Sequence, residues 1–460
     1  MSQSSEVKAA IKALAEQVKG EVFSPGGKGY AEEMTGAQTA ATRKPDVIVG
    51  AAGEDDVVAA VRFAAAHGLP VAAQGTGHSL GDVDGGVVIT TRRLDGVRVN
   101  ADERTAWVEA GVPWGKVAEE AGKHGLAPLS GSAPAVCAVS YLLGGGLGLM
   151  SRRYGFGADH VRALDVVTAD GELRHVTAES DADLFWALRG GRDNFGVVTG
   201  VEIDLLPVAT LYGGGLFFDV ERAEDVINAW ERWVRTVPEE MTSSLAMVPF
   251  PDIPVLPEPL RGKHLVHVRF AYIGDAESGE KLVEPLRAIG PRVLESLREM
   301  PYTESGSISN DPTNPMPYYG SNAMLSDLDS TAIHTFLELT GPGADPQFIV
   351  ELRHLGGAIA RPPAVANAVG HRDAAFTFGV LTKLASDDAD VTPVREAHEA
   401  VLKAMAPWTV GRCLNFVYST LTAEEVAEAY NPDDYERLTH LKARFDPINT
   451  FRLNYNIPPA

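Results

Sequence analysis

The chain has 460 residues, of which 45% are apolar and 22% charged, and this composition excludes a wholly disordered protein. It holds 40 basic and 62 acidic residues, a net charge of −22, so its surface would repel nucleic acid and anionic membranes. The two cysteines, Cys137 and Cys413, exclude a disulfide framework and a cysteine-rich zinc site. The length predicts two or three domains, or one large enzyme.

No apolar run approaches the ~20 residues of a membrane span. The first residues, MSQSSEVKAAIKALAEQVKG, read as an amphipathic helix and lack the basic start and apolar core of a secretory signal. We therefore expect a cytoplasmic protein with neither a membrane nor a nucleic acid as partner. The Ala-, Gly- and Val-rich composition favours a bacterial host.

Residues from Arg43 to Pro207 alternate strand-like and helical runs, with glycine-rich loops between them. Strands are predicted at PDVIVGA, LPVAAQ, VVITTRRL and TAWVEAG. Helices are predicted at EDDVVAAVRFAAAHG, which Gly68 ends, at about Trp114 to His124, and at SDADLFWAL. The run VRALDVVTADGELRHVT predicts a hairpin that turns at Ala169-Asp170-Gly171.

Residues 210–420 differ from the preceding residues in that they contain few glycine-rich loops. Strand-like runs are GGGLFFDV, SLAMVPF, HLVHVRFAYIG, QFIVELRHLGG, AAFTFGVLTK and CLNFVYST. They alternate with helical runs such as AEDVINAWERWVRTV and PVREAHEAVLKAMA, which predicts a mainly antiparallel sheet with helices on one face. The last stretch, from DDYERLTHL onward, predicts a helix, a turn and an extended tail.

Three glycine clusters stand out in the first 207 residues. They are GTGHSLGDVDGG around His78, Gly144-Gly145-Gly146-Leu147-Gly148, and Gly190-Gly191-Arg192-Asp193-Asn194-Phe195-Gly196. Such loops let backbone N–H groups approach an anion closely, but none is a P-loop or a clean dinucleotide fingerprint. The first could equally be a tight turn; the three together indicate one long ligand, such as a dinucleotide.

The sequence resembles a known family in four places, in order and from about residue 40 to 460. These are PVAAQGTGHSLGDVDGGVVI, LLGGGLGLMSRRYGFGADHV, FWALRGGRDNFGVVT and YERLTHLKARFDPINTFRLNYNIPP. They are similar to the berberine-bridge-enzyme-like FAD-linked oxidases of the vanillyl-alcohol-oxidase / p-cresol-methylhydroxylase (PCMH) superfamily.

The resemblance implies an α+β fold with a PCMH-type two-part FAD-binding domain and a substrate domain. Residues 1–207 would form the N-terminal part of the FAD domain, with its core at about 42–207. Residues 208–420 would form the substrate domain, and 421–460 would return to the FAD domain. We expect a monomer or a homodimer.

The resemblance also implies that His78 carries FAD covalently, through a ring nitrogen bonded to the flavin 8α-methyl. The alternative is a loop histidine that only contacts the cofactor. Many family members add a second bond from a cysteine, but here that position holds Ala133, and Cys137 stands where the family has glycine. We therefore predict FAD attached through His78 only, the alternative being a local shift that brings Cys137 to the flavin.

One position matches a family residue that is linked to oxygen reactivity, and several others differ from the family pattern. Val136 takes the position that gates oxygen, where a small valine goes with oxidases. Gln74, Thr76, Tyr141 and Tyr455 replace an arginine, a glycine, a histidine and a glutamine, and Arg192-Asp193 replaces two glycines. The FAD contacts that we predict besides His78 are Gln74, Gly75, Thr76, Gly77, Ser79, Leu80, Val136, Cys137, Gly144, Gly145, Gly146, Gly148, Asn194, Gly196, Val198, Asn415, Asn454 and Asn456.

The family's proton-accepting base often lies on a strand that ends in Gly-Gly, which here is FIVELRHLGG. Strand alternation places Glu351, Arg353 and Leu355 on one face. We predict Glu351 as the proton acceptor and Arg353 as the cation that orients the substrate; the alternative is a surface ion pair. Tyr141 is a further catalytic candidate, since a nearby cation can lower a tyrosine pKa.

The predicted substrate pocket holds Leu147, Leu149, Tyr418 and Tyr455, although tyrosines often only pack with one polar end bonded. His267, His354 and His371 lack metal-ligand spacing, so no metal is predicted.

The resemblance implies an FAD-dependent oxidase. Hydride would pass from a small or medium organic substrate (an amine, an alcohol or a polyketide-type natural product) to FAD, and O2 would reoxidise the cofactor with release of H2O2. The single histidine link favours amines or polyketides. The alternatives are a dehydrogenase with another electron acceptor, a flavoprotein that catalyses a non-redox cyclisation, and a binding protein without flavin.

Overall fold

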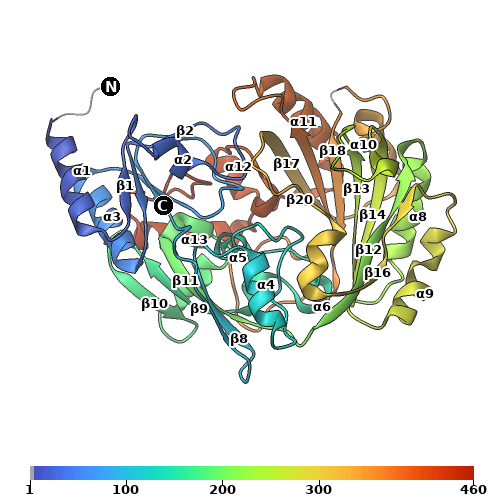
Figure 1. Cartoon of the computed structure of the whole chain (residues 1–460), viewed down its shortest axis with the longest axis horizontal. Coiled ribbons are helices and arrows are strands. Elements are labelled where there is room, and N and C mark those ends of the chain that lie inside the picture. The colour runs from blue at the N-terminus through green and yellow to red at the C-terminus, as the bar shows by residue number, and fades with distance from the viewer. Residues whose placement is uncertain (1–4, 346) are drawn as a thin grey trace.

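The structure is a computed structural model and describes residues 5–345 and 347–460. Figure 1 shows the first two hundred residues and the C-terminal helix α13 on one side, and the strands and helices from β12 to α11 on the other. The predicted α+β class is confirmed. The N-terminal helix α1 spans Ser5–Gln17, and the first four residues of the predicted helix lie outside the described part.

The N-terminal side begins with a small sheet in the order β1-β3-β6-β4. Its strands are β1 (Glu21–Phe23), β3 (Val47–Gly50), β4 (Val71–Gln74) and β6 (Val87–Thr90), with β6 parallel to β3 and to β4. Helix α3 (Glu54–His67) makes the crossover and ends at Gly68, whose φ of 64° is the left-handed cap that glycine favours. The strands and helix predicted here are confirmed.

A second, antiparallel sheet runs in the order β10-β9-β11-β8-β7. Its strands are β7 (Val97–Asn100), β8 (Thr105–Glu109), β9 (Val161–Val167), β10 (Leu173–Thr177) and β11 (Val197–Asp204). Strands β9 and β10 form the predicted hairpin. Shorter elements of this side are α2 (Tyr30–Met34), β2 (Arg43–Lys44), β5 (Val83–Asp84), α4 (Trp114–Gly122), α5 (Ala138–Leu143), α6 (Ser151–Tyr154) and α7 (Ala182–Leu188).

The other side is built on a nine-stranded sheet, in the order β15-β12-β14-β13-β18-β19-β17-β20 with β16 beside β12. The strands are β12 (Thr210–Asp219), β13 (Met241–Pro249), β14 (His264–Tyr272), β15 (Leu294–Glu295), β16 (Arg298–Pro301), β17 (Tyr318–Leu325), β18 (Ile349–His354), β19 (Phe376–Lys383) and β20 (Thr409–Gly411). Its strands pair antiparallel throughout the described residues. The predicted antiparallel sheet is confirmed.

Two details of this sheet differ from the sequence prediction. CLNFVYST is not a strand: Leu414–Phe416 forms a single 3₁₀ turn, because this segment leaves the sheet edge to cross toward the glycine-rich loops. Strand β17, at YYGSNAML, was missed. Its Gly, Ser and Asn interrupt the apolar alternation that marks a half-buried strand.

The two faces of the large sheet have opposite character. One face is apolar and lies under α8 (Ala223–Val234), α9 (Ala276–Arg287), α10 (Ser330–Thr340) and α11 (Thr392–Ala404). Its core includes Leu245, Val268, Leu352 and Phe378, all buried. The other face carries polar and small side chains. Strand alternation imposes this division, since neighbouring residues point to opposite faces.

The C-terminal segment returns to the N-terminal side. It contains α12 (Ala423–Ala427) and α13 (Pro432–Phe445), and its side chains join the core cluster that also holds β3, α3 and β9. Lys442 and Asp446 form an ion pair of 2.8 Å with neither side chain exposed. The Lys442 ammonium also donates to the carbonyls of Asn194, at 2.6 Å, and Phe451, at 3.0 Å. The tail is thereby fixed to the third glycine cluster.

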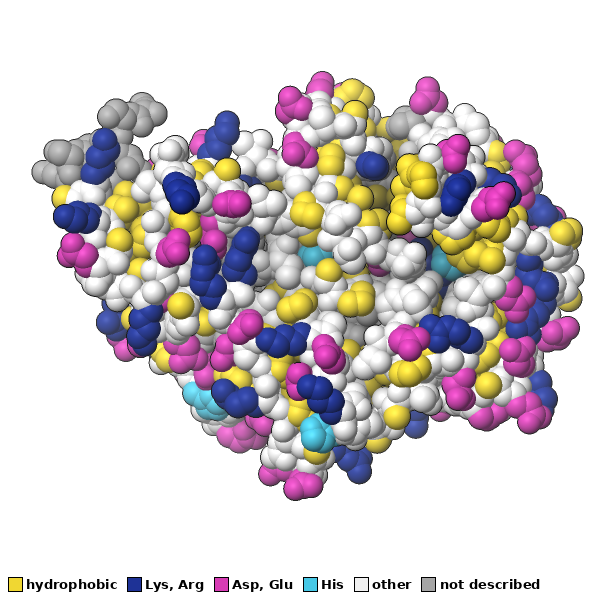
Figure 2. Space-filling model, viewed as in Figure 1, with side chains coloured by type: hydrophobic (Ala, Val, Ile, Leu, Met, Phe, Trp, Pro, Cys, Tyr) yellow, Lys and Arg dark blue, Asp and Glu magenta, His cyan; other side chains and the backbone are white. Residues whose placement is uncertain are grey.

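Within residues 5–345 and 347–460 no helix has the length and apolar character needed to cross a membrane. Figure 2 shows basic side chains interspersed with acidic ones over one face of the molecule.

Candidate active site

The histidine loop leaves the end of β4 and is shaped by its glycines. Gly77 has a φ of 71°, and a Cβ added to it would lie 2.6 Å from the Cα of Gly36. Only glycine fits this left-handed, crowded position. The loop therefore presents His78 at a fixed place beside the end of the strand.

His78 is mostly buried, and its ring is held by a neighbour two residues earlier. Its Nδ1 lies 2.8 Å from the hydroxyl of Thr76. Burial lowers the pKa of His78 to about 4, because a charged imidazolium is costly away from water. The imidazole is therefore neutral at neutral pH and keeps an unprotonated nitrogen, which is the form that can act as a nucleophile.

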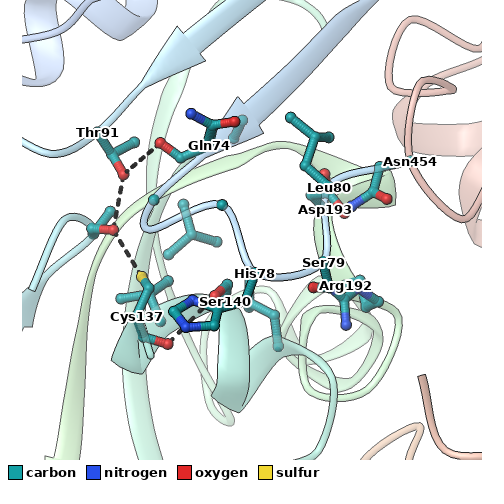
Figure 3. A pocket seen from close by; sticks show the side chains of 17 residues that line it. Gln74, His78, Ser79, Leu80, Thr91, Cys137, Ser140, Arg192, Asp193 and Asn454 are labelled. Atoms are coloured by element: carbon teal, nitrogen blue, oxygen red, sulfur yellow. Dashed lines mark hydrogen bonds between the residues drawn. The ribbon is translucent and has the colours of Figure 1, made fainter. Parts of the chain in front are cut away.

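A cavity of about 620 Å³, counted to its open mouth, surrounds this loop. We call it the cofactor cavity. Figure 3 shows the side chains that line it, with His78, Cys137 and Ser140 on one side of the loop and Arg192, Asp193 and Asn454 on the other. The full lining is Ala73, Gln74, Gly75, Gly77, His78, Ser79, Leu80, Thr91, Ala110, Cys137, Val139, Ser140, Leu143, Arg192, Asp193, Val198 and Asn454.

The predicted FAD contacts divide into two groups. Gln74, Gly75, Gly77, His78, Ser79, Leu80, Cys137, Val198 and Asn454 line the cavity. The described lining does not include Thr76, Val136, Gly144, Gly145, Gly146, Gly148, Asn194, Gly196, Asn415 or Asn456. Thr91, Ser140, Arg192 and Asp193 line it without having been predicted as contacts. Thr91 and Ser140 lie outside the glycine clusters, so no local pattern marked them.

The cofactor cavity holds polar atoms that the described part of the chain leaves without a hydrogen-bond partner. They are Oε1 of Gln74, Nε of Arg192 and Oδ1 of Asn454, all buried. Buried polar groups are normally paired, and an unpaired one needs an explanation. A long ligand with its own donors and acceptors, such as FAD, would supply the missing partners, so these residues fit the cofactor.

Cys137 lies at the wall of the same cavity but is chemically quiet. Its thiol donates to the carbonyl of Ala110 at 3.1 Å, and a Cβ on Gly75 would lie 2.7 Å from its sulfur. Burial raises the pKa of the Cys137 thiol. The thiol is therefore protonated, and the thiolate, which is the nucleophile, is disfavoured.

The three consecutive glycines pack against protein. A Cβ on Gly144 would lie 1.9 Å from Oδ1 of Asn415, and one on Gly146 would lie 2.4 Å from the ring of Tyr141. Protein side chains therefore make the close approaches at Gly144 and Gly146. Asn415 donates from its amide nitrogen to the carbonyl of Tyr141 at 2.9 Å, which fixes this crossing.

Two further predicted residues hold the C-terminal tail. The amide of Asn194 donates to the carbonyls of Gly191, at 3.0 Å, and Tyr455, at 3.1 Å, and it accepts from the N–H of Ile457 at 2.8 Å. The hydroxyl of Tyr455 donates to the carbonyl of Val417 at 2.8 Å. The side chains of Asn194 and Tyr455 therefore form hydrogen bonds with backbone groups of the protein itself.

A second cavity, of about 470 Å³ including its mouth, lies between the second glycine cluster and the polar face of the large sheet. We call it the sheet cavity. Its wall is mostly apolar and includes Leu147 and Leu149, as predicted for the substrate pocket. The described lining does not include Tyr418 or Tyr455. It is Leu147, Gly148, Leu149, Ser151, Thr242, Ser243, Ser244, Arg269, Phe270, Ala271, Ile308, Ser309, Arg353, His354, Leu355 and Ile359.

Glu351 and Arg353 meet on β18, as strand alternation predicts. Arg353 donates to Oε2 of Glu351 from Nε at 3.1 Å and from Nη2 at 2.8 Å. A second arginine, Arg269 on β14, donates to Oε1 at 2.7 Å. Arg269 was missed because it lies 82 residues away in sequence, and only the strand order β14-β13-β18 brings it there.

This double clamp sets the ionisation of Glu351. Burial raises its pKa, but Arg353 and Arg269 outweigh burial and leave the pKa below its ordinary value. Glu351 is therefore ionised at neutral pH and able to accept a proton, though the two guanidinium groups weaken it as a base.

Tyr141 and Tyr418 remain protonated at neutral pH. Burial raises the pKa of both phenols, and the opposing influence of Arg353 does not compensate. The hydroxyl of Tyr141 is buried and finds no partner in the described part of the chain. Both are hydrogen-bond donors rather than resting bases.

Comparison with known proteins places these features in a family. Residues 45–177 match the model described as "FAD binding domain", and residues 414–458 match the one described as "Berberine and berberine like". The chain therefore carries an FAD-binding domain and a berberine-bridge-enzyme-like C-terminal segment, and it is similar over almost its whole length to FAD-linked oxidoreductases. The two matches contain the histidine loop and the returning tail, which meet at the cofactor cavity.

The similarity to known proteins extends over almost the whole chain. The chain is 28% identical to (R)-6-hydroxynicotine oxidase of Paenarthrobacter nicotinovorans, over 96% of this chain and 97% of the relative. The crystal structure of 6-hydroxy-D-nicotine oxidase from Arthrobacter nicotinovorans superposes with a TM-score of 0.81, at 25% identity over 96% of this chain and 98% of that one. Glucooligosaccharide oxidase from Acremonium strictum shares the fold, with a TM-score of 0.84 at 22% identity over 98% and 99% of the two chains, and carries a 6-S-cysteinyl, 8α-N1-histidyl FAD.

Proposed function

We propose that the protein is an FAD-dependent oxidase. It would take a hydride from a small or medium organic substrate and return the electrons to O2 as H2O2. The single observation that carries the proposal is a neutral, mostly buried His78 in a cavity where three buried polar atoms have no hydrogen-bond partner among the described residues. The named relatives act on 6-hydroxynicotine and on oligosaccharides, and both are called oxidases.

When bound, FAD would supply a two-electron acceptor. The chain's own residues would position the substrate and manage its proton. We propose that Glu351 accepts the proton from the substrate's O–H or N–H while the neighbouring C–H gives up its hydride. Arg353 would orient the substrate, and the low pKa of Glu351 keeps it ionised and ready for this role.

We further propose that FAD is attached through His78 alone. The neutral imidazole and the protonated thiol of Cys137 support this, because only the histidine is in its nucleophilic form at neutral pH. The rival is the double attachment that glucooligosaccharide oxidase carries.

The proposal also includes the domain division at residues 207 and 420 and a monomeric or homodimeric state. It further includes a cytoplasmic location and a role with natural products.

The first test is on denatured protein. The purified chain is precipitated with acid, the protein band is inspected for flavin fluorescence, and mass spectrometry locates the modified peptide. We expect flavin on the peptide that contains His78 and none on the one that contains Cys137. Flavin on both peptides would contradict the single link, and flavin in the supernatant alone would contradict covalent attachment.

A second test separates the oxidase from its alternatives. The flavin is reduced photochemically without substrate and mixed with air-saturated buffer in a stopped-flow instrument. We expect rapid reoxidation with one H2O2 formed per flavin, in line with the small Val136 at the proposed oxygen gate. Slow reoxidation would favour a dehydrogenase. Substrate turnover without peroxide and without flavin reduction would favour a cyclisation.

A further inference from the structure

The mostly apolar wall of the sheet cavity contains two arginines, which a shared cross-strand neighbour places in one row. Arg269 on β14 is opposite Ser244 on β13, and Ser244 is opposite Arg353 on β18. Directly opposite residues of antiparallel strands point to the same face. The three side chains therefore form one row, and all three line the cavity.

The charge of this row is unbalanced. Arg269 and Arg353 share the single carboxylate of Glu351, which leaves one positive charge in excess. Both arginines are largely buried, with 10% and 17% of their side chains exposed. A buried charge without a partner is costly, so the excess charge favours an anionic occupant.

Among the described residues, no nearby group cancels the excess positive charge. His354 lines the cavity, but burial lowers its pKa to about 3, so it is neutral. Arg152 lies behind it, donates to its Nε2 at 2.8 Å, and adds to the positive potential. Of the other carboxylates, Asp311 is exposed to solvent, and Glu239 is already paired with Arg361 through two bonds of 2.6 and 2.8 Å.

The wall also has donors to offer. Among the described residues, none accepts a hydrogen bond from Nη1 of Arg353 or Nη2 of Arg269. The hydroxyl of Thr242 is buried without a partner, and the side chains of Ser244 and Ser309 line the same cavity. Guanidinium forks and hydroxyls at close range form the donor set that recognises a carboxylate.

We propose that the sheet cavity binds the carboxylate of an organic acid with an apolar body, and that such acids rather than amines are the substrates. Calling the acid a substrate rests on the proposed oxidase function; its binding does not. The single excess charge fits a monoanionic carboxylate better than a phosphate dianion. The apolar side chains Leu147, Leu149, Ile308 and Ile359 would contact the rest of the molecule.

The test uses three probes of similar shape: phenylacetate, phenylacetamide and phenethylamine. Binding to the purified holoenzyme is measured by isothermal titration calorimetry at pH 7.5, which needs no turnover. We expect phenylacetate to bind at least about tenfold tighter than the amide, and the amine to bind weakest. Equal binding of acid and amide, or tightest binding of the amine, would overturn the proposal.

Variants test whether the arginines of the row cause the preference for the acid. Arg353→Gln should remove the preference for the acid, whereas Arg62→Gln, at an exposed ion pair with Glu172, should leave it unchanged. Glu351→Gln should tighten acid binding, because it frees the guanidinium donors. If Arg353→Gln does not fold, Ser309→Asp adds the opposing charge without touching the clamp and should abolish the preference. An acid preference that persists in a folded Arg353→Gln or in Ser309→Asp would contradict the proposal.

The same experiments keep the two proposals separate. A protein without flavin that still prefers phenylacetate would contradict the oxidase function and support the anion site. A protein with covalent flavin and no acid preference would contradict the anion site alone.

Discussion

The cofactor cavity and the sheet cavity are constructed in different ways. The first is centred on a loop within a few residues of one strand end, where Gly77 allows the backbone to turn and His78 follows it directly. Distant residues such as Arg192 and Asn454 complete its wall. The second is formed by side chains from β13, β14 and β18, brought together only by strand pairing. The loop around His78 can therefore be recognised in the sequence, whereas the wall of the sheet cavity can be recognised only once the strand order is known.

Polar atoms mark the same difference. In the cofactor cavity, Gln74, Arg192 and Asn454 keep buried atoms without partners among the described residues. At the sheet cavity, two lining arginines, Arg269 and Arg353, share the carboxylate of Glu351, which is not itself part of the described lining, and the imbalance is one of charge. The first pattern fits a large cofactor with several donors and acceptors; the second fits a small charged group.

The largest effect is expected at the histidine loop. His78→Ala should abolish covalent FAD entirely, because it removes the only nucleophilic nitrogen on the loop. Cys137→Ser in the same cavity should leave the covalent flavin in place. Both are read by flavin fluorescence of the acid-denatured band. Loss of covalent flavin in Cys137→Ser would show that the thiol takes part.

The next effect concerns the clamped carboxylate. Glu351→Gln should slow flavin reduction by about 100-fold or more, since a general base typically contributes that much. Stopped-flow reduction under anaerobic conditions measures it, with Glu304→Gln, at an exposed ion pair, as control. A wild-type rate in Glu351→Gln would exclude the base role; a changed KM with unchanged kcat would assign Glu351 to positioning Arg353.

The pH profile sharpens this test. A base must be ionised to act, and the arginines lower the pKa of Glu351, so the acid limb of the reduction rate should lie below the ordinary glutamate pKa of about 4.3. Arg269→Met removes one of the charges that lower this pKa and should move the limb to higher pH. A limb that does not move would show that Glu351 does not control it.

A smaller effect tests the buried lysine that fixes the tail. Lys442→Met leaves Asp446 charged and buried, and breaking a buried pair costs about 3–5 kcal/mol of unfolding free energy. Denaturant unfolding measures this loss. Lys281→Met, at a solvent-exposed pair with Glu277, should leave the midpoint unchanged. An unchanged midpoint in Lys442→Met would show that the tail is held by its apolar contacts alone.

The smallest effect is expected at His398, on helix α11 beside the large sheet. This buried residue is bonded to Ser321 and Thr382, and burial lowers its pKa to about 4. The unfolded histidine titrates near 6.5, so the stabilisation is complete above that pH and is lost as the pH falls toward about 4, by at most about 3 kcal/mol. Unfolding midpoints of His398→Gln should fall less over this range than those of the wild type or of the exposed His440→Gln.

Much of the fold could be predicted from the chain because periodicity and turn residues act locally. The run EDDVVAAVRFAAAHG has helical spacing and a glycine cap, and it forms α3. CLNFVYST has strand-like composition and forms a 3₁₀ turn, because its backbone is needed to cross between the two sides rather than to extend a sheet. Strand β17 was missed because small or polar residues stand on both of its faces: Ser321 bonds to His398 of α11, and Asn322 bonds to the backbone of Cys413.

The sequence by itself determined the family, the histidine loop and the pairing of Glu351 with Arg353, since each depends on residues close together in the chain. Only the tertiary structure decided that Gly144 and Gly146 pack against Asn415 and Tyr141, and that Asn194 and Tyr455 fix the tail. It alone added Arg269 to the clamp. Charge balance in a cavity depends on which strands are neighbours, and that order is set by packing of the whole sheet.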